Sequence, residues 1–584
     1  MGICHSTHNN GFNDSEPLSP RVVERKRSIA LSHLASTALS AHSQETIVSH
    51  SEKGLPVPTK DHYISLPPPL FDERFITPNL VQGDSATAYK SFLRQHPEYK
   101  LTWLLDSLRK SDFTRLEKSG EVYVDYMGGS LYPESLVRMH SAFLQENVLG
   151  NTHSVSNSAQ LSADCMQEAR ESVLAFFRAP PEYTVVFTAN ATAALKLVGE
   201  SFPFTENGTY VLGADSHNSL HGIREFSYKA GSHVVYIEST SQGGLNEPYA
   251  KSVLMTHRPR SKGDAKALFA LTGTSNISNS KNPLSLIQYA SSLGYSTLLD
   301  AAALAPHSII SLWETPVDAM AVSFYKMFGF PTGIGALVVK KSFLSQLKRP
   351  WFSGGNVNVV QVPGKLVTRS HELHEQFEDG TVNYTLLSAV TDGLRLLSAY
   401  MPFLPLRLSC LTTYLVSSLL KIRHDSTGRP VVCILSRRPN TRLKAIGEQA
   451  ETASTVSLIF LSPSGETIPN SFIEYAATAS KISLRTGCMC NSGGAAAILG
   501  IASDMKKLYE GVTLKDFERL VGRELGVVRI SLGLVSNFLD VWRVLRFVED
   551  IIGCQARRED VWEQWKKEKG ITEGADARQV GQAL

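Results

Sequence analysis

One lysine of this chain stands where desolvation would lower its pKa. Lys326 follows an apolar, strand-like run at 318–323 and precedes a turn rich in glycine and proline, after which a second apolar run begins at Ala336. Between two buried strands a lysine is poorly placed to pair with carboxylates, so burial favours its neutral amine. A neutral amine can form a Schiff base with a carbonyl group, the chemistry that pyridoxal phosphate requires. A surface lysine on a hairpin fits this stretch equally well.

An acidic residue at the end of a predicted strand is the second candidate. The segment 295–303 is typical of a buried strand that ends at Asp300. Ligands of open α/β sheets bind at the carboxyl ends of strands, so Asp300 would point into the site. An acid there can keep a pyridinium nitrogen protonated and the ring an electron sink. The alternative is an aspartate that caps the following helix.

A single phosphate could bind where the stretch 184–199 passes from a predicted strand into a helix. The helix opens near Ala191 and Thr192. Free backbone amides and the positive end of the helix dipole attract phosphate, and a threonine hydroxyl adds a donor. The stretch has neither the Walker pattern nor the glycines of a dinucleotide fingerprint, so one phosphate is favoured over a pyrophosphate.

The roles of two further polar residues depend on which groups they contact in the fold. His217 lies in a loop before a predicted helix, where a lone histidine is more often structural than catalytic. Arg529 lies in the middle of a predicted strand, where an unpaired charge is costly. We therefore expect Arg529 to face a carboxylate of the protein or of a ligand.

Two thiols lie in a glycine-flanked loop just after Arg485. Cys488 and Cys490 form a single CxC, which without a second Cys or His pair is a poor zinc site. A mobile loop thiol near a cation should have a lowered pKa and act as a nucleophile. His371 and His374 lack the HExxH spacing, so no metal site is expected there.

The whole chain has the composition of a multidomain globular protein. Its 584 residues are 42% apolar and carry 58 basic and 55 acidic side chains, a balance that gives no reason to expect nucleic acid as a partner. Seven cysteines are few and odd in number, which favours a reducing compartment and hence the cytoplasm. No apolar run reaches 18 residues, and no secretory signal is found.

We predict four segments from these patterns. Residues 1–65 are rich in Ser and His and are expected to form a disordered N-terminal tail. Its first residues, MGICHS, fit N-myristoylation at Gly2 with palmitoylation at Cys4; a bare tail is the alternative. Residues 66–395 would form a large domain with an N-terminal helical segment, 396–556 a small domain with the Cys loop, and 557–584 a charged tail.

Nine motifs in order across about residues 120–552 resemble a known family. They are THSVSNSA, FTANATAALKL, DSHNSLHGIRE, TSNISNSKNPL, LLDAAA, SFYKMFGFPTGIGAL, FEDGTVNY, RTGCMCN and RISLG. The set is similar to the N-terminal, aminotransferase class V domain of molybdenum cofactor sulfurases. This domain belongs to the same class of pyridoxal phosphate enzymes as the cysteine desulfurases. The resemblance implies an α/β fold of type I, with a large domain on a central, mostly parallel sheet and a smaller α+β C-terminal domain.

The resemblance also implies roles for single residues around pyridoxal 5'-phosphate. Lys326 would be the Schiff-base lysine, Asp300 the pyridine partner and His217 the residue against the ring. Ala191, Thr192 and Ser323 would hold the phosphate, Thr381 would reach a neighbouring subunit's phosphate, and Asn276 would lie near the ring hydroxyl and the substrate. Arg529 would hold the substrate carboxylate. Cys490 would be the nucleophile, with Cys488 in reserve.

The implied activity removes sulfur from L-cysteine, giving alanine and an enzyme persulfide in a homodimer, with the molybdenum cofactor or an acceptor protein receiving the sulfur. Two departures from the family pattern matter: cysteine desulfurases usually carry Gln where this chain has Ala303, and we expect no room for the C-terminal cofactor-binding domain of full-length sulfurases. The alternatives are another class V enzyme of secondary metabolism, such as a C–S lyase, racemase or aminotransferase, and a non-catalytic adaptor.

Overall fold

The computed structural model describes residues 84–259 and 266–570. The predicted tail with Gly2 and Cys4, and the end of the chain from 571, lie outside the described residues. No helix in the described ranges has both the length and the apolar composition needed to cross a membrane.

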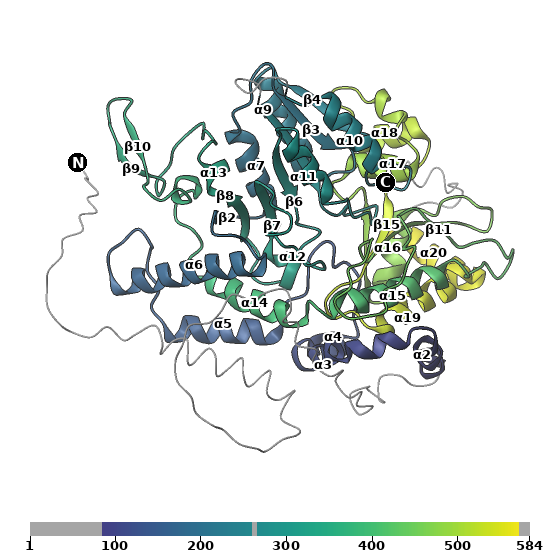
Figure 1. Cartoon of the computed structure of the whole chain (residues 1–584). Coiled ribbons are helices and arrows are strands. Elements are labelled where there is room, and N and C mark those ends of the chain that lie inside the picture. Colours follow the sequence, from purple (N-terminus) through teal and green to yellow (C-terminus); the bar gives the residue numbers. More distant parts are fainter. Residues whose placement is uncertain (1–83, 260–265, 571–584) are drawn as a thin grey trace. The chain divides into compact units, whose positions relative to one another are not determined.

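A seven-stranded sheet lies at the centre of the larger part of the fold (Figure 1). Its strands are β2 (Tyr183–Thr188), β3 (Thr209–Gly213), β4 (His233–Ile237), β5 (Ala267–Thr272), β6 (Ser296–Asp300), β7 (Ala319–Ser323) and β8 (Gly335–Lys340). They are ordered β2-β8-β7-β6-β5-β3-β4, and only β8 runs antiparallel to its neighbours. Every residue of β5 and β7 is buried, as expected for strands covered on both faces. The predicted mostly parallel α/β fold is thereby confirmed.

Helices that follow the strands pack against this sheet. They are α7 (Ala191–Ser201), α9 (Ile223–Lys229), α10 (Glu247–Thr256) and α11 (Ser285–Ser292). Three more, α5 (Glu134–Glu146), α6 (Asn157–Phe176) and α14 (Leu387–Tyr400), lie side by side (Figure 1). The Ser156 side chain accepts a hydrogen bond from the Ala159 backbone and caps the start of α6. Short elements follow β8: α13 (Lys341–Leu344) and the hairpin of β9 (Val357–Val360) and β10 (Val367–Arg369).

A four-stranded antiparallel sheet organises the C-terminal part. Its order is β11 (Val432–Ile434), β12 (Thr455–Phe460), β15 (Val527–Ser531) and β14 (Arg485–Gly487). The helices of this part are α15 (Leu404–Leu419), α16 (Asn470–Ala479), α17 (Ser492–Leu499), α18 (Leu514–Val521), α19 (Phe538–Phe547) and α20 (Gln555–Lys569). Trp565 on α20 is fully buried and its ring contacts Phe472, so this helix belongs to the folded body rather than to the charged tail that the sequence indicated from 557.

The N-terminal helices pack on the C-terminal part. They are α2 (Asp84–Gln95), α3 (Trp103–Asp112) and α4 (Thr114–Ser119), and they were expected to belong to the large domain. Instead, Tyr89 of α2 contacts the Phe538 ring of α19. After them, β1 (Val122–Tyr123) pairs in parallel with β13 (Ile482–Ser483). The described residues from Asp84 onward therefore pack on the C-terminal part before the chain forms the central sheet, which local patterns could not reveal.

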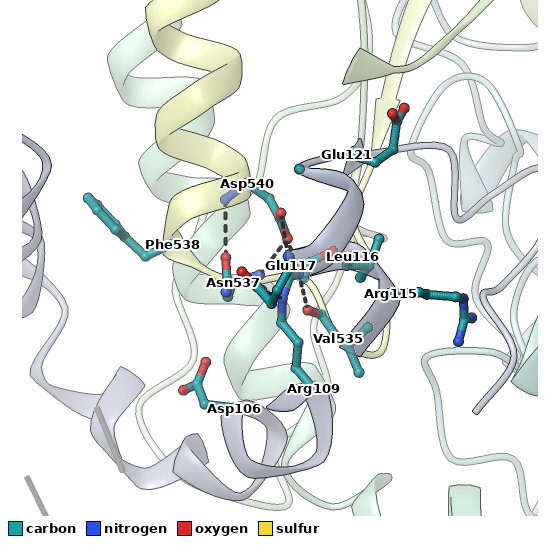
Figure 2. Close-up of polar contacts among 12 residues, drawn as sticks. Asp106, Arg109, Arg115, Leu116, Glu117, Glu121, Val535, Asn537, Phe538 and Asp540 are labelled. Carbon is teal, nitrogen blue, oxygen red and sulfur yellow. Dashed lines mark hydrogen bonds and ion pairs between the residues drawn. The ribbon is translucent and has the colours of Figure 1, made fainter. Parts of the chain in front are cut away.

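A buried ion pair holds this packing, as Figure 2 shows. Arg109 of α3 donates from Nη1 to Asp540 Oδ2 over 2.6 Å and from Nη2 to Asp540 Oδ1 over 3.0 Å. The same guanidinium donates to the Val535 carbonyl at 2.8 Å and to Glu117 at 2.8 Å. Arg109 is 6% exposed and Asp540 3%. Such a pair is costly to break because one charge stays buried without its partner.

We expect Asp540→Ala to lower the free energy of unfolding by about 3 kcal/mol, because it leaves the Arg109 guanidinium buried and underpaired. Urea denaturation followed by tryptophan fluorescence measures the change. Glu117→Ala is the matched control: the Glu117 side chain is 29% exposed, so its loss should cost less than about 1 kcal/mol. An equal loss of unfolding free energy in the two variants would contradict the prediction that the buried Arg109–Asp540 pair contributes more than the partly exposed Arg109–Glu117 pair.

Candidate functional site

A cavity of about 340 Å³ opens at the carboxyl ends of β3, β5, β6 and β7. Most residues that sequence patterns or the family resemblance predicted for the site line it: Ala191, Thr192, His217, Asn276, Asp300, Ser323 and Lys326. Loops of parallel strands meet at this edge, which is where ligands of open α/β sheets bind. Because these residues span more than a hundred positions of sequence, the fold is what brings them together.

Lys326 lies on a one-turn helix, α12 (Phe324–Phe328), directly after β7. The sequence placed it at the tip of a turn; buried Phe324, Met327 and Phe328 make a helical turn instead and leave the lysine facing the cavity. Burial lowers the pKa of Lys326, and Asp300 opposes that shift without cancelling it. The pKa of Lys326 is therefore shifted in the direction that the desolvation argument predicted.

Asp300 and His217 face the same cavity from the ends of β6 and β3, which lie on either side of β5. Asp300 ends β6, is 7% exposed, and accepts a hydrogen bond from the Ala302 backbone at 3.1 Å. His217 precedes the short helix α8 (Asn218–His221), and its Nδ1 accepts from the Ser219 backbone at 3.1 Å. Burial lowers the pKa of His217, Asp300 raises it, and Lys326 lowers it further. Burial thus favours the neutral imidazole, and the role implied for His217 against the ring stays a prediction.

The start of α7 forms a cradle for an anion. The Ala191 backbone donates to Ser323 Oγ at 2.9 Å, and Thr192 Oγ1 lies 2.8 Å from Ser219 Oγ. Asn190 caps the helix by accepting from the Ala193 backbone at 2.9 Å. Hydroxyl groups gathered around the positive end of an 11-residue helix can bind a phosphate.

Thr381 lies apart from this cavity. It is exposed, accepts a hydrogen bond from Asn151 Nδ2 at 3.3 Å, and lines a second cavity of about 380 Å³ beside α7. The role implied for it concerns a neighbouring subunit, so it stays a prediction.

Arg529 lies behind the cavity wall. It is 1% exposed on β15, its Nη2 lies 2.5 Å from Asp125 Oδ1, and its Nη1 donates to the Asn276 carbonyl at 3.0 Å. Asp125 is thus the carboxylate that we expected to face Arg529, because an unpaired charge in the middle of a strand is costly. The pairing ties Arg529 to the cavity through Asn276, and sequence reasoning had not singled out Asp125.

The thiol loop is fixed to the cavity wall. The Cys490 carbonyl accepts from the Asn218 backbone at 2.7 Å, and the Met489 carbonyl accepts from Asn276 Nδ2 at 2.7 Å. The sequence predicted a mobile loop, which these bonds contradict. Cys490 is exposed, whereas Cys488 is half-buried among apolar residues.

The expectation of a lowered pKa is wrong for Cys488. Burial raises the pKa of its thiol, and nearby Glu518 raises it further, so the expected effect of Arg485 does not prevail. The geometry therefore favours Cys490 over Cys488 as the reactive thiol.

One buried cluster of three side chains resembles a metal site. His96, Glu98 and Cys410 offer ligand atoms within 4.8 Å of one another. Arg442 already lies among them, with Nε 2.5 Å from Glu98 Oε1 and Nη1 2.9 Å from His96 Nδ1. Burial, then Glu98, raises the pKa of Cys410 to about 12. An arginine and a protonated thiol explain this cluster better than a metal ion does.

Comparisons with known proteins agree with this architecture. A sequence profile of the family described as aminotransferase class-V matches residues 122–427. Molybdenum cofactor sulfurase of Arabidopsis thaliana is 32% identical over 478 residues, which cover 76% of this chain and 58% of that protein. The Homo sapiens protein of the same name is also 32% identical, covering 76% of this chain and 51% of its own length. This chain thus spans about half to three fifths of the length of these relatives.

Solved structures show the same fold. Cysteine desulfurase from Thermococcus onnurineus superposes with a TM-score of 0.61 at 22% identity, covering 76% of this chain and 98% of that structure. The cysteine desulfurase CsdA of Escherichia coli gives a TM-score of 0.58 at 19% identity, covering 79% and 98%.

Proposed function

The chain belongs to the class V aminotransferase family, and from that membership we propose that it is a pyridoxal phosphate-dependent cysteine desulfurase. It removes sulfur from L-cysteine, releases alanine and keeps the sulfur as a persulfide on Cys490. The observation that carries the proposal is that one cavity gathers Lys326, Asp300 and the anion cradle, and that the thiol loop is bonded to its wall.

Members of this family use pyridoxal 5'-phosphate, and the cavity fits that cofactor. The start of α7 with Ser323 and Thr192 would hold the phosphate, Asp300 the pyridine nitrogen and His217 one face of the ring. Lys326 would hold the aldehyde carbon. When bound, the cofactor supplies an electron sink for charge that develops on the substrate.

The chain's own residues carry the remaining steps of the proposed reaction. Nζ of Lys326 takes the proton from the α-carbon of cysteine. The substrate carboxylate would take the place of Asp125 as the partner of Arg529, whose guanidinium also donates to the Asn276 carbonyl. The Cys490 thiolate then attacks the substrate sulfur. The new S–S bond forms, the Cβ–S bond breaks, and its electron pair stays with the carbon fragment. Cβ takes up a proton, and the proton held by Lys326 returns to the α-carbon, which gives alanine.

The test adds L-cysteine to purified protein with its cofactor and measures alanine together with protein-bound persulfide. Equal amounts of both in the first turnover support the proposal. Pyruvate without persulfide would indicate a C–S lyase, D-cysteine a racemase, and failure to bind the cofactor an adaptor; each of these results overturns the desulfurase proposal.

We further propose a homodimer in the cytoplasm, with the molybdenum cofactor or an acceptor protein as the receiver of the sulfur. The names of the relatives make the molybdenum cofactor the first acceptor to test. Protein loaded with radioactive sulfur from cysteine should pass this sulfur to isolated molybdenum cofactor faster than to a small thiol. Light scattering of the purified protein measures whether it is a dimer.

We also propose acylation at Gly2. Radiolabelled myristate, incorporated by the wild type but not by Gly2→Ala, would support it.

A further inference from the structure

A buried carboxyl group lies at the base of the thiol loop. Asp215 follows β3 and is 1% exposed. It accepts hydrogen bonds from Ser275 Oγ at 2.6 Å, Ser278 Oγ at 2.6 Å, the Gly244 backbone at 2.8 Å and Asn491 Nδ2 at 2.7 Å. Burying such a group is costly unless it is fully hydrogen-bonded, and these four donors meet that requirement.

Asn491 connects this carboxyl group to the thiol loop. It directly follows Cys490 and is fully buried. Its Nδ2 donates to Asp215 Oδ1 at 2.7 Å and to Asn276 Oδ1 at 3.0 Å, while its own Oδ1 accepts from the Gly494 backbone at 2.9 Å. The side chain thus caps α17 with one end and binds the large sheet's loops with the other.

The backbone before Asn491 is held in an unfavourable conformation. Met489 has φ of 56° and Cys490 φ of 52°, values in the left-handed region that residues other than glycine rarely adopt. Such a conformation persists only where surrounding contacts over-determine it. The bonds from Asn276 to the Met489 carbonyl and from the Asn218 backbone to the Cys490 carbonyl supply those contacts.

Close packing adds to the hydrogen bonds. A Cβ atom on Gly493 would lie 2.0 Å from the Ala214 carbonyl oxygen, and one on Gly494 would lie 2.3 Å from Asp215 Oδ1. The start of α17 therefore contacts the turn after β3 at a distance that only glycine permits. The same turn carries His217, which lines the cavity.

We propose that Asp215 and Asn491 are positioning residues that set the sulfur of Cys490 at the cavity, an inference that rests on the proposed function. Asp215, Asn276 and Asn491 together form what we call the polar anchor. The anchor fixes the chain on both sides of the Cys490 α-carbon, through the Met489 carbonyl and the Asn491 side chain. Displacing a reacting group by about 1 Å can cost about 100-fold in rate.

The test compares variants of the full-length protein loaded with its cofactor. We expect Asn491→Ala to lower kcat for persulfide formation about 100-fold while KM and cofactor binding stay near the wild-type values. Asn491→Asp keeps an acceptor for the Gly494 backbone but sets a second carboxyl group against Asp215, so the same loss is expected. The double variant Asp215→Asn with Asn491→Asp restores one donor and one acceptor between the two positions and should recover part of the rate.

A matched control separates anchoring from helix capping. Asn537 caps α19 as Asn491 caps α17, but it lies away from the cavity. Asn537→Ala should therefore leave kcat within about twofold of the wild type, since a lost cap alone costs about 1 kcal/mol of stability and moves no reacting group. A 100-fold fall in kcat for this control as well would overturn the proposal.

A second readout does not depend on the activity. Release of the anchor should raise the rate at which iodoacetamide alkylates the half-buried thiol of Cys488 and the rate of tryptic cleavage after Arg485, because a released loop opens more often. Both rates should rise at least about tenfold in Asn491→Ala. If the wild type forms no persulfide, the proposed desulfurase fails while these rates still test the anchor. Unchanged alkylation, cleavage and kcat in Asn491→Ala would refute the anchor itself.

Discussion

Replacing Lys326 with alanine should lower the production of alanine and persulfide by at least about 1000-fold, because the variant loses both the amine that holds the cofactor and the base for the α-proton. Lys326 faces the cavity, and burial keeps its pKa below the ordinary lysine value. Borohydride treatment of the holoprotein followed by peptide mapping provides a second measurement. The cofactor should be found attached to residue 326 in the wild type and to no lysine in the variant.

Lys281→Ala is the matched control for this experiment. Lys281 is a half-buried lysine, and burial lowers its pKa to about 8, but its amine donates to the Ala450 carbonyl away from the main cavity. Its loss should leave the turnover within several-fold of the wild type. Attachment of the cofactor at Lys281, or normal turnover by Lys326→Ala, would show that the site has been assigned to the wrong lysine.

Replacing Cys490 with alanine should abolish the protein-bound persulfide while the cofactor is bound as in the wild type. The Cys490 side chain is exposed, and the loop is held through its carbonyl, so the alanine variant keeps the bond to the Asn218 backbone. Without a nucleophilic thiol the substrate sulfur has no acceptor on the protein, and we expect turnover to fall at least about 100-fold. Mass spectrometry of the intact protein after one addition of L-cysteine measures the persulfide.

Cys488→Ala separates the two thiols. Burial raises the pKa of Cys488, so less of it is the reactive thiolate, and its loss should leave persulfide formation within several-fold of the wild type. A persulfide found on Cys488 in the Cys490→Ala protein, with turnover retained, would reverse the assignment.

The sequence predicted those parts of the site that follow directly from local patterns. The strand that ends at Asp300 and the helix that opens at Ala191 are signalled by apolar runs and small residues, and both lie where they were expected. Residues brought together over long distances could not be found in this way. Asp215 and Asn491 are 276 positions apart, and although each lies in one of the motifs quoted above, nothing in the sequence shows that the two residues meet.

Two errors have the same physical origin. A loop composed of Gly, Cys and Asn has the composition of a mobile segment, and only its tertiary hydrogen bonds decide that it is held. The thiol of Cys488 follows Arg485 in sequence, but apolar neighbours from α17 and α18 decide its pKa. Spacing in the sequence shows which charged residues lie near one another along the chain. It does not show how deeply they are buried, and burial decides how strongly they shift a neighbouring pKa.

The left-handed backbone at Met489 and Cys490 also constrains the last step of sulfur delivery. The proposed persulfide on Cys490 would be held beside the cavity by the hydrogen bonds to the Met489 and Cys490 carbonyls, so its recipient has to come to this loop. Because the Cys490 side chain is exposed, an acceptor protein or a small molecule would meet the proposed persulfide at the surface of this loop.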